Sequence, residues 1–469
     1  MINYKEFLRS KHVAAKPSGF ESGELPSAMF PFQADVTRWA CRQGRAGAWL
    51  QTGLGKTIVQ LSWAEQVHRH TGGNVLILCP LAVAKQTARE GVKHGIKTPV
   101  KVCRSGLDVE PGISVTNYQM LKHFNGDKFA GVVVDESDIL ADFTGTTKRM
   151  ICDKFRKAMY KLDCSATPAP NDYMEIGNHS DFLGVLPSND MLSRWFINDL
   201  SEAGKYRLKD HGKEDFWRWI STWACVVAKP SDLGYEDGAY DLPPLSIHQH
   251  LVEVDHVDGR EDGMLFRMPT MSATSMHGEL RRSTETRASK VLDLVDSLDN
   301  REPALIWCHT DYEADALAER IPDAVEVRGS HTVERKEQAL EDFQLGKIRI
   351  LISKPGICGH GLNFQHCRTV IFAGLDYSFK GFYQAIRRCW RFGQTKPVNV
   401  HVILGETEGR LLETIQRKQA DYDEMQSQMR AAVLRYGLGA DGRMRTLAGY
   451  EPAVPMILPS WLQGVASNG

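Results

Sequence analysis

Short apolar runs alternate with helical stretches in two separate parts of the chain, and this alternation constrains the fold more than any other feature. In the first part the apolar runs are 48–50, 75–79, 113–118, 132–134 and 162–166. Runs that are apolar almost throughout are typical of parallel strands buried on both faces. Between them, residues 56–70 and 81–94 indicate helices that stop near Gly72 and Gly95, where glycine supplies a left-handed cap. The pattern predicts a doubly wound α/β domain.

The same alternation returns in the second half of the chain. Candidate strands there are 304–308, 348–353 and 370–372, and candidate helices are 311–320, 333–343 and 382–391. We therefore expect two α/β lobes, at residues 25–169 and 285–405, preceded by a short N-terminal segment, 1–24.

The segment between the lobes, 170–284, loses strand periodicity and contains a loop rich in helix breakers. We expect a mainly helical insertion followed by a connector. Its aromatic side chains favour a buried core over a base-stacking platform, because burial is their commoner use. The tryptophans in question are Trp195, Trp217, Trp219 and Trp223. Charged helical periodicity at 406–436 assigns residues 406–469 to a C-terminal helical extension.

The charge balance excludes a general attraction to polyanions. The 469 residues include 57 basic and 58 acidic side chains, a net charge of −1, so any site for nucleic acid has to be local. The longest apolar stretch, 75–84, is far shorter than the roughly 20 residues that a membrane-spanning helix needs. The ten cysteines include no Cys-x-x-Cys pair, which favours buried thiols in a reducing compartment. We expect an intracellular, cytoplasmic protein with no membrane partner.

A glycine-rich turn follows the first predicted strand and opens a predicted helix. Its residues are Thr52, Gly53, Leu54, Gly55, Lys56 and Thr57. Backbone N–H groups in such a turn can hold phosphates, while Lys56 would reach the β and γ phosphates and Thr57 would bind Mg²⁺. The match to a full P-loop is partial, because Leu50 stands where a further glycine is usual. The alternative is an ordinary turn between a strand and a helix.

Two adjacent carboxylates end the apolar run 132–134. Asp135 and Glu136 have the arrangement in which an ATPase binds Mg²⁺ through the aspartate and orients water through the glutamate. A solvated turn is the alternative, but in a parallel sheet these carboxylates would emerge at the same edge as Lys56. Together the two motifs predict ATP hydrolysis with ATP and Mg²⁺ as the bound groups.

From about residue 30 to 418, the order of motifs resembles the superfamily-two helicase ATPases, most closely the Swi/Snf-like branch of DNA translocases. In the first lobe the similar segments are 32–33, 53–57, 79–81, 115–118, 135–138 and 165–168. In the second lobe they are 351–353, 361–363 and the long stretch 384–397. The resemblance implies two RecA-like lobes with ATP in the cleft between them. It also implies that Gln33 reads adenine, that Gln384 lines the cleft, and that Arg388 and Arg391 reach the γ-phosphate.

The charge of the second lobe agrees with that assignment. Residues 378–404 include five Lys or Arg and no acid, although the whole chain is nearly neutral. A guanidinium supplied from an opposing lobe stabilises the charge that spreads over a transferring phosphoryl group. A solvated helix face is the alternative for basic residues in this setting.

Nucleic-acid contacts in such motors go mostly to phosphates, through backbone N–H groups and small polar side chains. The resemblance carries this role to Thr116, Asn117, Ser353 and Asn363, each of which suits a turn or cap equally well. A basic run at 148–161 favours a solvated helix face over a DNA contact.

Our first hypothesis is an ATP-dependent motor that moves along double-stranded DNA, of a compact viral or bacterial type, and thus in the host cytoplasm if viral. A strand-separating DNA or RNA helicase is the first alternative, since Asp138 stands where many members carry His and 165–167 is closer to RNA helicases. A nucleotide-binding scaffold that recruits a nuclease is the second. A separate nuclease or a recombination or replication protein is an open partner, and the oligomeric state is also open.

Overall fold

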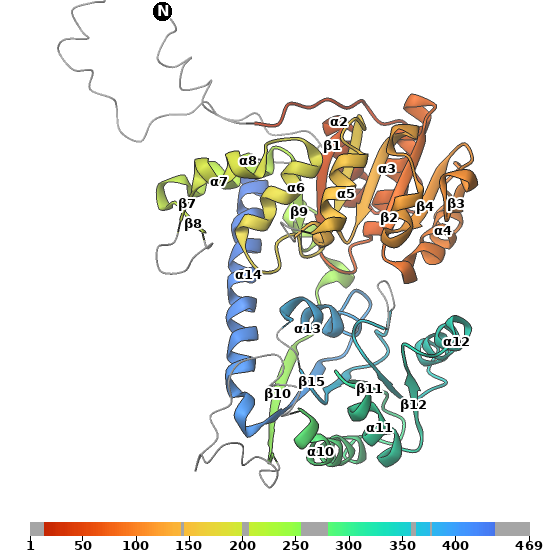
Figure 1. Cartoon of the computed structure of the whole chain (residues 1–469), viewed down its shortest axis with the longest axis vertical. Helices are drawn as coiled ribbons and strands as arrows, with labels where there is room; N and C mark the ends of the chain where they lie inside the picture. Colours follow the sequence, from red (N-terminus) through yellow and green to blue (C-terminus); the bar gives the residue numbers. More distant parts are fainter. Residues whose placement is uncertain are drawn as a thin grey trace, which may run out of the picture.

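The computed structural model describes residues 14–141, 145–198, 206–254, 280–357, 363–375 and 378–436. They form two α/β lobes, each built on a sheet whose strand pairs are all parallel (Figure 1). The first sheet has the strand order β3-β4-β2-β5-β6-β1-β9, and the second has the order β10-β15-β14-β11-β13-β12. The expected fold class, two doubly wound lobes with further helices, is confirmed.

The first sheet contains the five strands predicted from the apolar runs. They are β1 (Arg45–Leu50), β2 (Asn74–Cys79), β4 (Ile113–Asn117), β5 (Phe129–Asp135) and β6 (Tyr160–Cys164). A short edge strand, β3 (Val100–Val102), was not expected. The helices of this lobe are α2 (Pro31–Gln43), α3 (Lys56–Thr71), α4 (Ala84–Lys93) and α5 (Thr146–Lys154). Because parallel strands end at one edge of the sheet, β1 and β5 present their carboxyl ends on the same side.

The segment between the lobes contains more strands than we expected. Its helices are α6 (Ile176–Leu183), α7 (Ser188–Trp195) and α8 (Lys213–Ser221). Two short strands, β7 (Phe196–Asn198) and β8 (Tyr206–Leu208), form an antiparallel pair. After them, β9 (Ala224–Val227) joins the first sheet beside β1, and β10 (Leu245–Val252) joins the second beside β15. The domain boundaries at 169 and 284 therefore stay predictions, since the residues between them belong partly to both sheets.

All four tryptophans of this segment are buried, with 0 to 6% of their surface exposed, so the expectation of a core role is confirmed. The basic run at 148–161 is partly the expected solvated face, since Arg149, Arg156 and Lys157 are exposed, but two of its lysines point inward. Lys148 donates to Asn178 Oδ1 at 2.6 Å, and Lys161 donates to the Phe182 carbonyl at 2.8 Å. Both lysines are buried, because each ammonium group satisfies an internal acceptor.

The second lobe contains strands β11 (Ala304–Trp307), β12 (Ala324–Val327), β13 (Ile350–Ser353), β14 (Thr369–Phe372) and β15 (Val398–Gly405). Its helices are α10 (Thr284–Asp296), α11 (Asp311–Arg320), α12 (Val333–Gln344) and α13 (Phe379–Ile386). The helix expected at 382–391 was placed wrongly, because α13 ends at Ile386 and the arginines follow it in a turn. In that turn the Cys389 N–H bonds to the Ile386 carbonyl at 3.0 Å, three residues back, which tightens the chain out of the α-helix.

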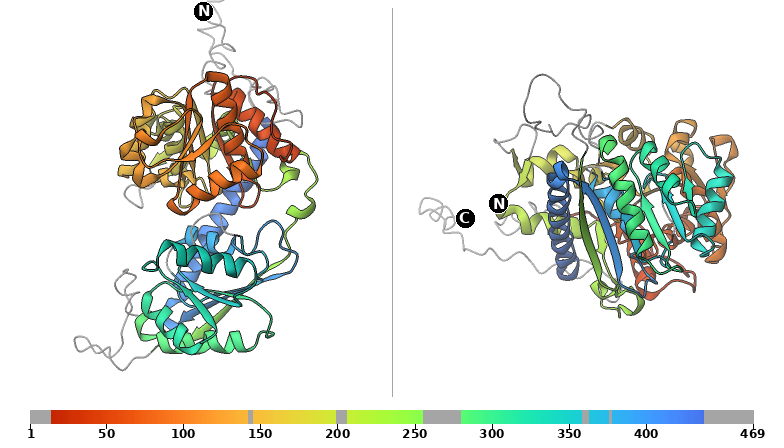
Figure 2. Two further views of the ribbon diagram at one scale, coloured as in Figure 1. Left: turned by 90° about the vertical axis from the view of Figure 1, so that its right-hand side faces the viewer. Right: turned by 90° about the horizontal axis from the view of Figure 1, so that it is seen from below.

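One long helix, α14 (Gly409–Tyr436), runs along one side of both lobes (Figures 1 and 2). It packs against α8 and β9 of the first lobe and against α13 of the second. The C-terminal extension is therefore a single helix as far as Tyr436, and residues 437–469 lie outside the described residues. Across the described ranges, no helix combines the length and apolar content that crossing a membrane requires.

Candidate active site

A cavity of about 290 Å³ lies between the two lobes. The first lobe lines it with Gln33, Thr52, Gly53, Gly55, Lys56, Thr57, Asp135 and Glu136. The second lobe lines it with Asn363, Gln384, Arg388 and Arg391. Of the residues predicted for catalysis and nucleotide binding, Leu54 alone is not in this lining. Sequence motifs that are more than 300 residues apart thus meet in one concave site.

The glycine-rich turn has a backbone that only glycine adopts easily. Gly53 has a φ of 96° and Gly55 has a φ of 81°, both in the left-handed region. A Cβ atom on Gly55 would lie 2.3 Å from Gln33 Nε2, and one on Gly53 would lie 3.2 Å from Phe392 Cβ. The turn leads directly into the N-terminus of α3, where unpaired N–H groups and the helix dipole favour an anion.

Gln33 connects this turn to the start of α2. Its Oε1 accepts from the Phe30 N–H at 2.9 Å, and its Nε2 donates to the Leu54 carbonyl at 2.9 Å. The contribution of Leu54 is therefore a backbone carbonyl that holds Gln33, while its own side chain is buried in the first lobe.

The two carboxylates lie at the end of β5. Gln60 Nε2 donates to Asp135 Oδ1 at 2.5 Å, and the Tyr118 hydroxyl donates to the Asp135 carbonyl. Burial and the neighbouring Glu136 carboxylate raise the pKa of Asp135 to about 7, although Lys56 opposes this shift. A cation next to Asp135 would lower that pKa, so the site is electrostatically suited to a divalent ion.

Glu136 itself has a φ of 51°, and it is the only residue other than glycine with a positive φ in the described ranges. Backbone strain of this kind costs about 1 to 3 kcal/mol and concentrates at functional sites. The strained turn directs the chain away from β5 directly after the two carboxylates.

Lys56 and Thr57 begin α3 and face the same cavity. The Lys56 ammonium group donates a long hydrogen bond, 3.4 Å, to the Leu50 carbonyl. Mg²⁺ prefers oxygen ligands such as carboxylates, hydroxyls and phosphates. The oxygen donors of Thr57 and Asp135, in one cavity, therefore fit the ion that the sequence predicts.

The two arginines enter the cavity from the turn after α13. Arg388 is buried, and its carbonyl accepts from the Phe364 N–H at 2.9 Å. Burial and the adjacent Arg388 lower the pKa of Arg391 to about 10, so the Arg391 guanidinium group is cationic at neutral pH. An anion between the lobes would interact favourably with both arginines.

The four residues predicted to contact nucleic acid do not lie together on one surface. Thr116 and Ser353 are buried, and the Ser353 hydroxyl donates to the Val327 carbonyl at 2.9 Å. Asn117 caps the turn after β4 by accepting from the Met120 N–H at 3.1 Å. Asn363 lines the cavity between the lobes. The hydroxyls of Thr116 and Ser353 are therefore not exposed to a phosphate backbone. The nucleic-acid role of all four residues stays a prediction.

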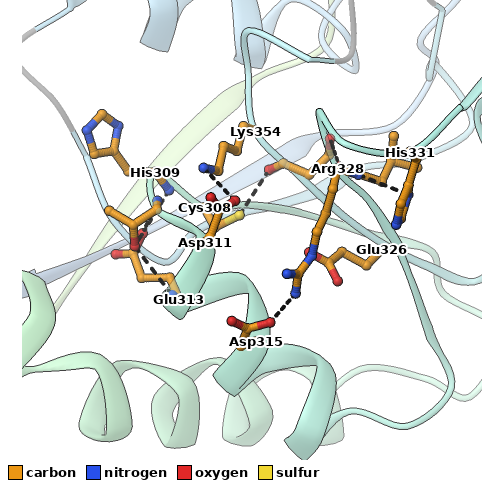
Figure 3. A network of polar contacts seen from close by, with 12 residues as sticks. Cys308, His309, Asp311, Glu313, Asp315, Glu326, Arg328, His331 and Lys354 are labelled. Atoms are coloured by element: carbon orange, nitrogen blue, oxygen red, sulfur yellow. Dashed lines mark hydrogen bonds and ion pairs between the residues drawn. The ribbon is translucent and has the colours of Figure 1, made fainter. Parts of the chain in front are cut away.

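The edge of the second lobe next to Ser353 carries cations that are already paired (Figure 3). Lys354 lies 2.9 Å from Asp311, and Arg328 forms ion pairs with Asp315 and Glu326. Charge at this edge is locally balanced, so hydrogen-bond donors rather than net positive charge would have to bind a phosphate there.

An ion pair between the lobes lies beside the cavity. The buried Asp138 accepts from Lys380 of α13 at 2.5 Å and from the Thr167 hydroxyl at 3.5 Å. Burial raises the pKa of Asp138 to about 6, although Lys380 opposes the shift.

Sequence reasoning missed several residues of the site. Gln60 and Tyr118 hold Asp135; no motif marks Gln60, and Tyr118 ends the similar segment 115–118 without a role being assigned to it. Phe30 and Phe392 lie next to predicted motif residues and could have been found from that proximity. Tyr240 also lines the cavity, but it comes from the connector, where the sequence carries no signal of a site.

Two family models match the chain. The model for the type III restriction enzyme, res subunit, matches residues 28–170, and the model for the helicase conserved C-terminal domain matches residues 286–393. The first match includes the first-lobe residues that line the cavity. The second match includes the second-lobe residues that line it.

Curated relatives are distant. The chain is 22% identical to the SWI/SNF-related matrix-associated actin-dependent regulator of chromatin subfamily A-like protein 1 of Xenopus tropicalis, covering 84% of this chain and 44% of that protein. It is 20% identical to the putative protein p41 of Acyrthosiphon pisum secondary endosymbiont phage 1, covering 80% and 92%. The chain spans less than half of the length of the curated helicases it matches.

Among solved structures, the chain is similar to the SWI2/SNF2 ATPase core of Sulfolobus solfataricus in complex with dsDNA. The TM-score is 0.43 at 15% identity, and the match covers 89% of this chain and 96% of that one.

Proposed function

We propose that the chain is a superfamily-two helicase-like ATPase of the Swi/Snf-like kind, and that it moves along double-stranded DNA, driven by ATP hydrolysis between its lobes. The observation that carries the proposal is the cavity lined from both lobes, with Lys56 and the two carboxylates on one side and Arg388 and Arg391 on the other. A site of this kind is complete only when the lobes are together, so hydrolysis and lobe movement are linked.

The roles we propose follow from the geometry. The glycine turn and Lys56 bind the phosphates, and Gln33 contacts the base. Thr57 and Asp135 would hold Mg²⁺, which would neutralise negative charge on the phosphates when bound. Glu136 orients the water that attacks the γ-phosphorus, while the bond from that phosphorus to the β–γ bridging oxygen breaks.

The arginines make the reaction depend on the second lobe. Arg388 and Arg391 stabilise negative charge on the transferring phosphoryl group, an effect worth about 10³ to 10⁵ in rate where a protein supplies such an arginine. When phosphate leaves, its negative charge no longer attracts the two arginines of the second lobe, which favours separation of the lobes. Repeated closing and opening would move the second lobe along the DNA.

Duplex DNA is proposed as the track on the resemblance of 384–397 to the Swi/Snf-like branch and on the similarity to a SWI/SNF-related protein. The ATPase test measures hydrolysis by the purified chain without nucleic acid and with duplex DNA, single-stranded DNA or RNA. We expect the largest stimulation with duplex DNA. Stimulation by single strands or RNA alone would contradict the proposal and favour strand separation.

Two variants of site residues and one surface control test the proposed roles in ATP turnover. Lys56→Ala and Glu136→Gln should abolish turnover, because one removes the phosphate cation and the other the group that orients water. Lys93→Ala, an exposed lysine at the end of α4, is the matched control and should leave turnover unchanged. Normal hydrolysis by either site variant would contradict the assignment.

A further inference from the structure

We propose that His179 is a positioning residue for ATP hydrolysis: its buried ring, protonated on both nitrogens, holds the segment 165–168 in place at the cavity between the lobes. This inference rests on the proposed function, because it concerns the same cavity, although His179 itself does not line it. The histidine lies on α6, outside every motif from which the sequence predicts the site.

Both ring nitrogens of His179 face an acceptor. Nδ1 lies 2.6 Å from Asp163 Oδ2, and Nε2 lies 2.6 Å from the Pro168 carbonyl oxygen. The side chains of His179 and Asp163 are fully buried, so water does not compete for these bonds. A carbonyl oxygen only accepts, and Nε2 therefore carries a hydrogen. The other oxygen of Asp163 accepts from Trp49 Nε1 at 3.4 Å, so the carboxylate has a donor on each side.

The surroundings favour the doubly protonated ring. A neutral ring with its hydrogen on Nε2 would set the Nδ1 lone pair against the Asp163 carboxylate, whereas an imidazolium donates to both partners. Burial lowers the pKa of His179, but Asp163 and the Pro168 carbonyl raise it by more, so the net shift of this pKa is upward. Two further charged groups that act on the ring, Asp138 and Glu175, are also carboxylates and favour the same cation.

The segment that His179 holds has further contacts around the cavity. Ala166 lines the cavity, and its carbonyl accepts from the Tyr422 hydroxyl of α14 at 2.6 Å. The Thr167 hydroxyl lies 3.5 Å from Asp138, which forms the ion pair between the lobes. The bond from His179 reaches the next residue along the chain. It therefore anchors the end of a segment that contacts the cavity, α14 and the ion pair between the lobes.

The same ion pair is connected to the phosphate turn. Trp49, which donates to Asp163, lies on β1 and packs edge-to-face against the His179 ring, with centroids 5.4 Å apart. The glycine-rich turn follows β1, and the segment 165–168 follows β6. One buried ion pair thus fixes two parts of the cavity wall relative to each other. Such spacing matters for catalysis, since a misplacement of about 1 Å can lower a rate about a hundredfold.

The charge of the ring is tested by nitrogen-15 NMR of the full chain with labelled histidines, at about pH 8, where an exposed histidine is neutral. The His179 signal is the one that disappears in His179→Met. We expect both of its ring nitrogens to have the chemical shifts of protonated nitrogens. The pattern of a neutral ring, with one unprotonated nitrogen, would overturn the imidazolium.

The positioning role is tested with two variants, neither of which leaves a buried charge unpaired. Asp163→Asn keeps the ring, whose Nε2–H still donates to Pro168, whereas Asp163→Asn combined with His179→Leu removes that donor. Relative to Asp163→Asn, the double variant should have a DNA-stimulated kcat about ten- to hundredfold lower, with the KM for ATP unchanged. A purely structural role would lower the urea midpoint and leave the kcat of the folded protein unchanged.

His68→Leu is the matched control, because His68 Nδ1 lies 2.8 Å from the Gly73 carbonyl oxygen, at the end of α3 that is far from the cavity. This variant should keep the wild-type kcat. If the double variant does not fold, His179→Met replaces His179→Leu in the same background, since methionine fills the space without a donor. The same fall in kcat is expected.

Equal kcat values for Asp163→Asn and the double variant would overturn the inference and leave the proposed function intact. A higher KM for ATP with kcat unchanged would also overturn it, because a positioning residue that does not touch ATP should not alter its binding. A wild-type chain without DNA-stimulated hydrolysis would instead overturn the proposed function, and this inference with it.

Discussion

At the scale of single residues, the most informative group outside the proposed chemistry is Asp138. Its side chain is almost completely buried, yet its partner Lys380 belongs to the other lobe. The same carboxylate contacts Thr167, which follows β6. A buried carboxylate that keeps one cationic partner depends on that partner, because an unpaired buried charge is costly. This ion pair is therefore a direct energetic connection between the lobes.

Removing the cation should destabilise the chain measurably. Lys380→Met leaves the Asp138 carboxylate without its ion pair, and we expect the free energy of unfolding to fall by about 1 to 3 kcal/mol. The midpoint of urea unfolding measures this change. Lys85→Met is the matched control, since Lys85 also pairs across the lobes, with Glu337 at 3.5 Å, but both side chains are mostly exposed. Equal shifts in the two variants would contradict the account.

The pH dependence of stability gives a second test of Asp138. Its pKa is about 6 in the folded chain against an ordinary value of 3.8. Between these values the folded state holds a proton that the unfolded state releases, so this group's contribution to stability falls as pH rises from about 4 to 6. Asp138→Asn removes that contribution. The difference in urea midpoint, Asp138→Asn minus wild type, should therefore rise between pH 4 and 6 and level off above pH 6. A difference that does not change with pH would contradict the assignment.

At the scale of elements, α14 connects three parts of the proposed machinery through one side chain. The buried Tyr422 hydroxyl donates to the Ala166 carbonyl at 2.6 Å and accepts from Gln51 at 3.4 Å. Gln51 directly precedes the glycine-rich turn, and its Oε1 accepts from the Tyr383 hydroxyl of α13 at 2.6 Å. The helix thus joins both lobes at positions adjacent to Thr52, Thr167 and Gln384.

Loss of this hydroxyl should affect catalysis as well as stability. We expect Tyr422→Phe to lower the free energy of unfolding by about 1 kcal/mol and to lower DNA-stimulated kcat about two- to tenfold, with KM for ATP unchanged. Steady-state kinetics and urea unfolding measure the two effects. Tyr436→Phe, on the same helix, removes a hydroxyl that donates to an exposed Glu214 at 2.6 Å, and serves as the control. The same kcat in both variants would contradict a connecting role for Tyr422.

The elements that the sequence predicts best are those with local signals. Buried parallel strands are apolar throughout, so β1, β2, β4, β5 and β6 could be placed, as could α3 and α11, which have clear ends. β9 and β10 could not be placed, because they acquire sheet partners that are distant in sequence. The site follows the same rule: its motif residues were predictable, whereas Tyr240, Gln60 and Tyr422 act through contacts that only the folded chain brings together.

At the scale of the whole molecule, the two lobes and the connector meet around one cavity, and α14 packs against both lobes. The first lobe supplies the phosphate turn and the carboxylates, the second supplies the arginines, and the connector supplies Tyr240. An ATPase built in this way turns over only when its lobes approach. A track that favours approach will stimulate hydrolysis, and hydrolysis will in turn release the lobes. This arrangement of the lobes supports ATP-driven movement along DNA.

Displacement of the third strand from a DNA triplex tests that claim most directly, because a motor moving along the duplex removes the strand without melting the duplex. With ATP and Mg²⁺, the wild-type chain should release the labelled strand, and release should cease with Glu136→Gln, which keeps the fold but not the hydrolysis. A wild-type chain that hydrolyses ATP on duplex DNA yet never releases the strand, or that releases it equally well without ATP, would contradict the account.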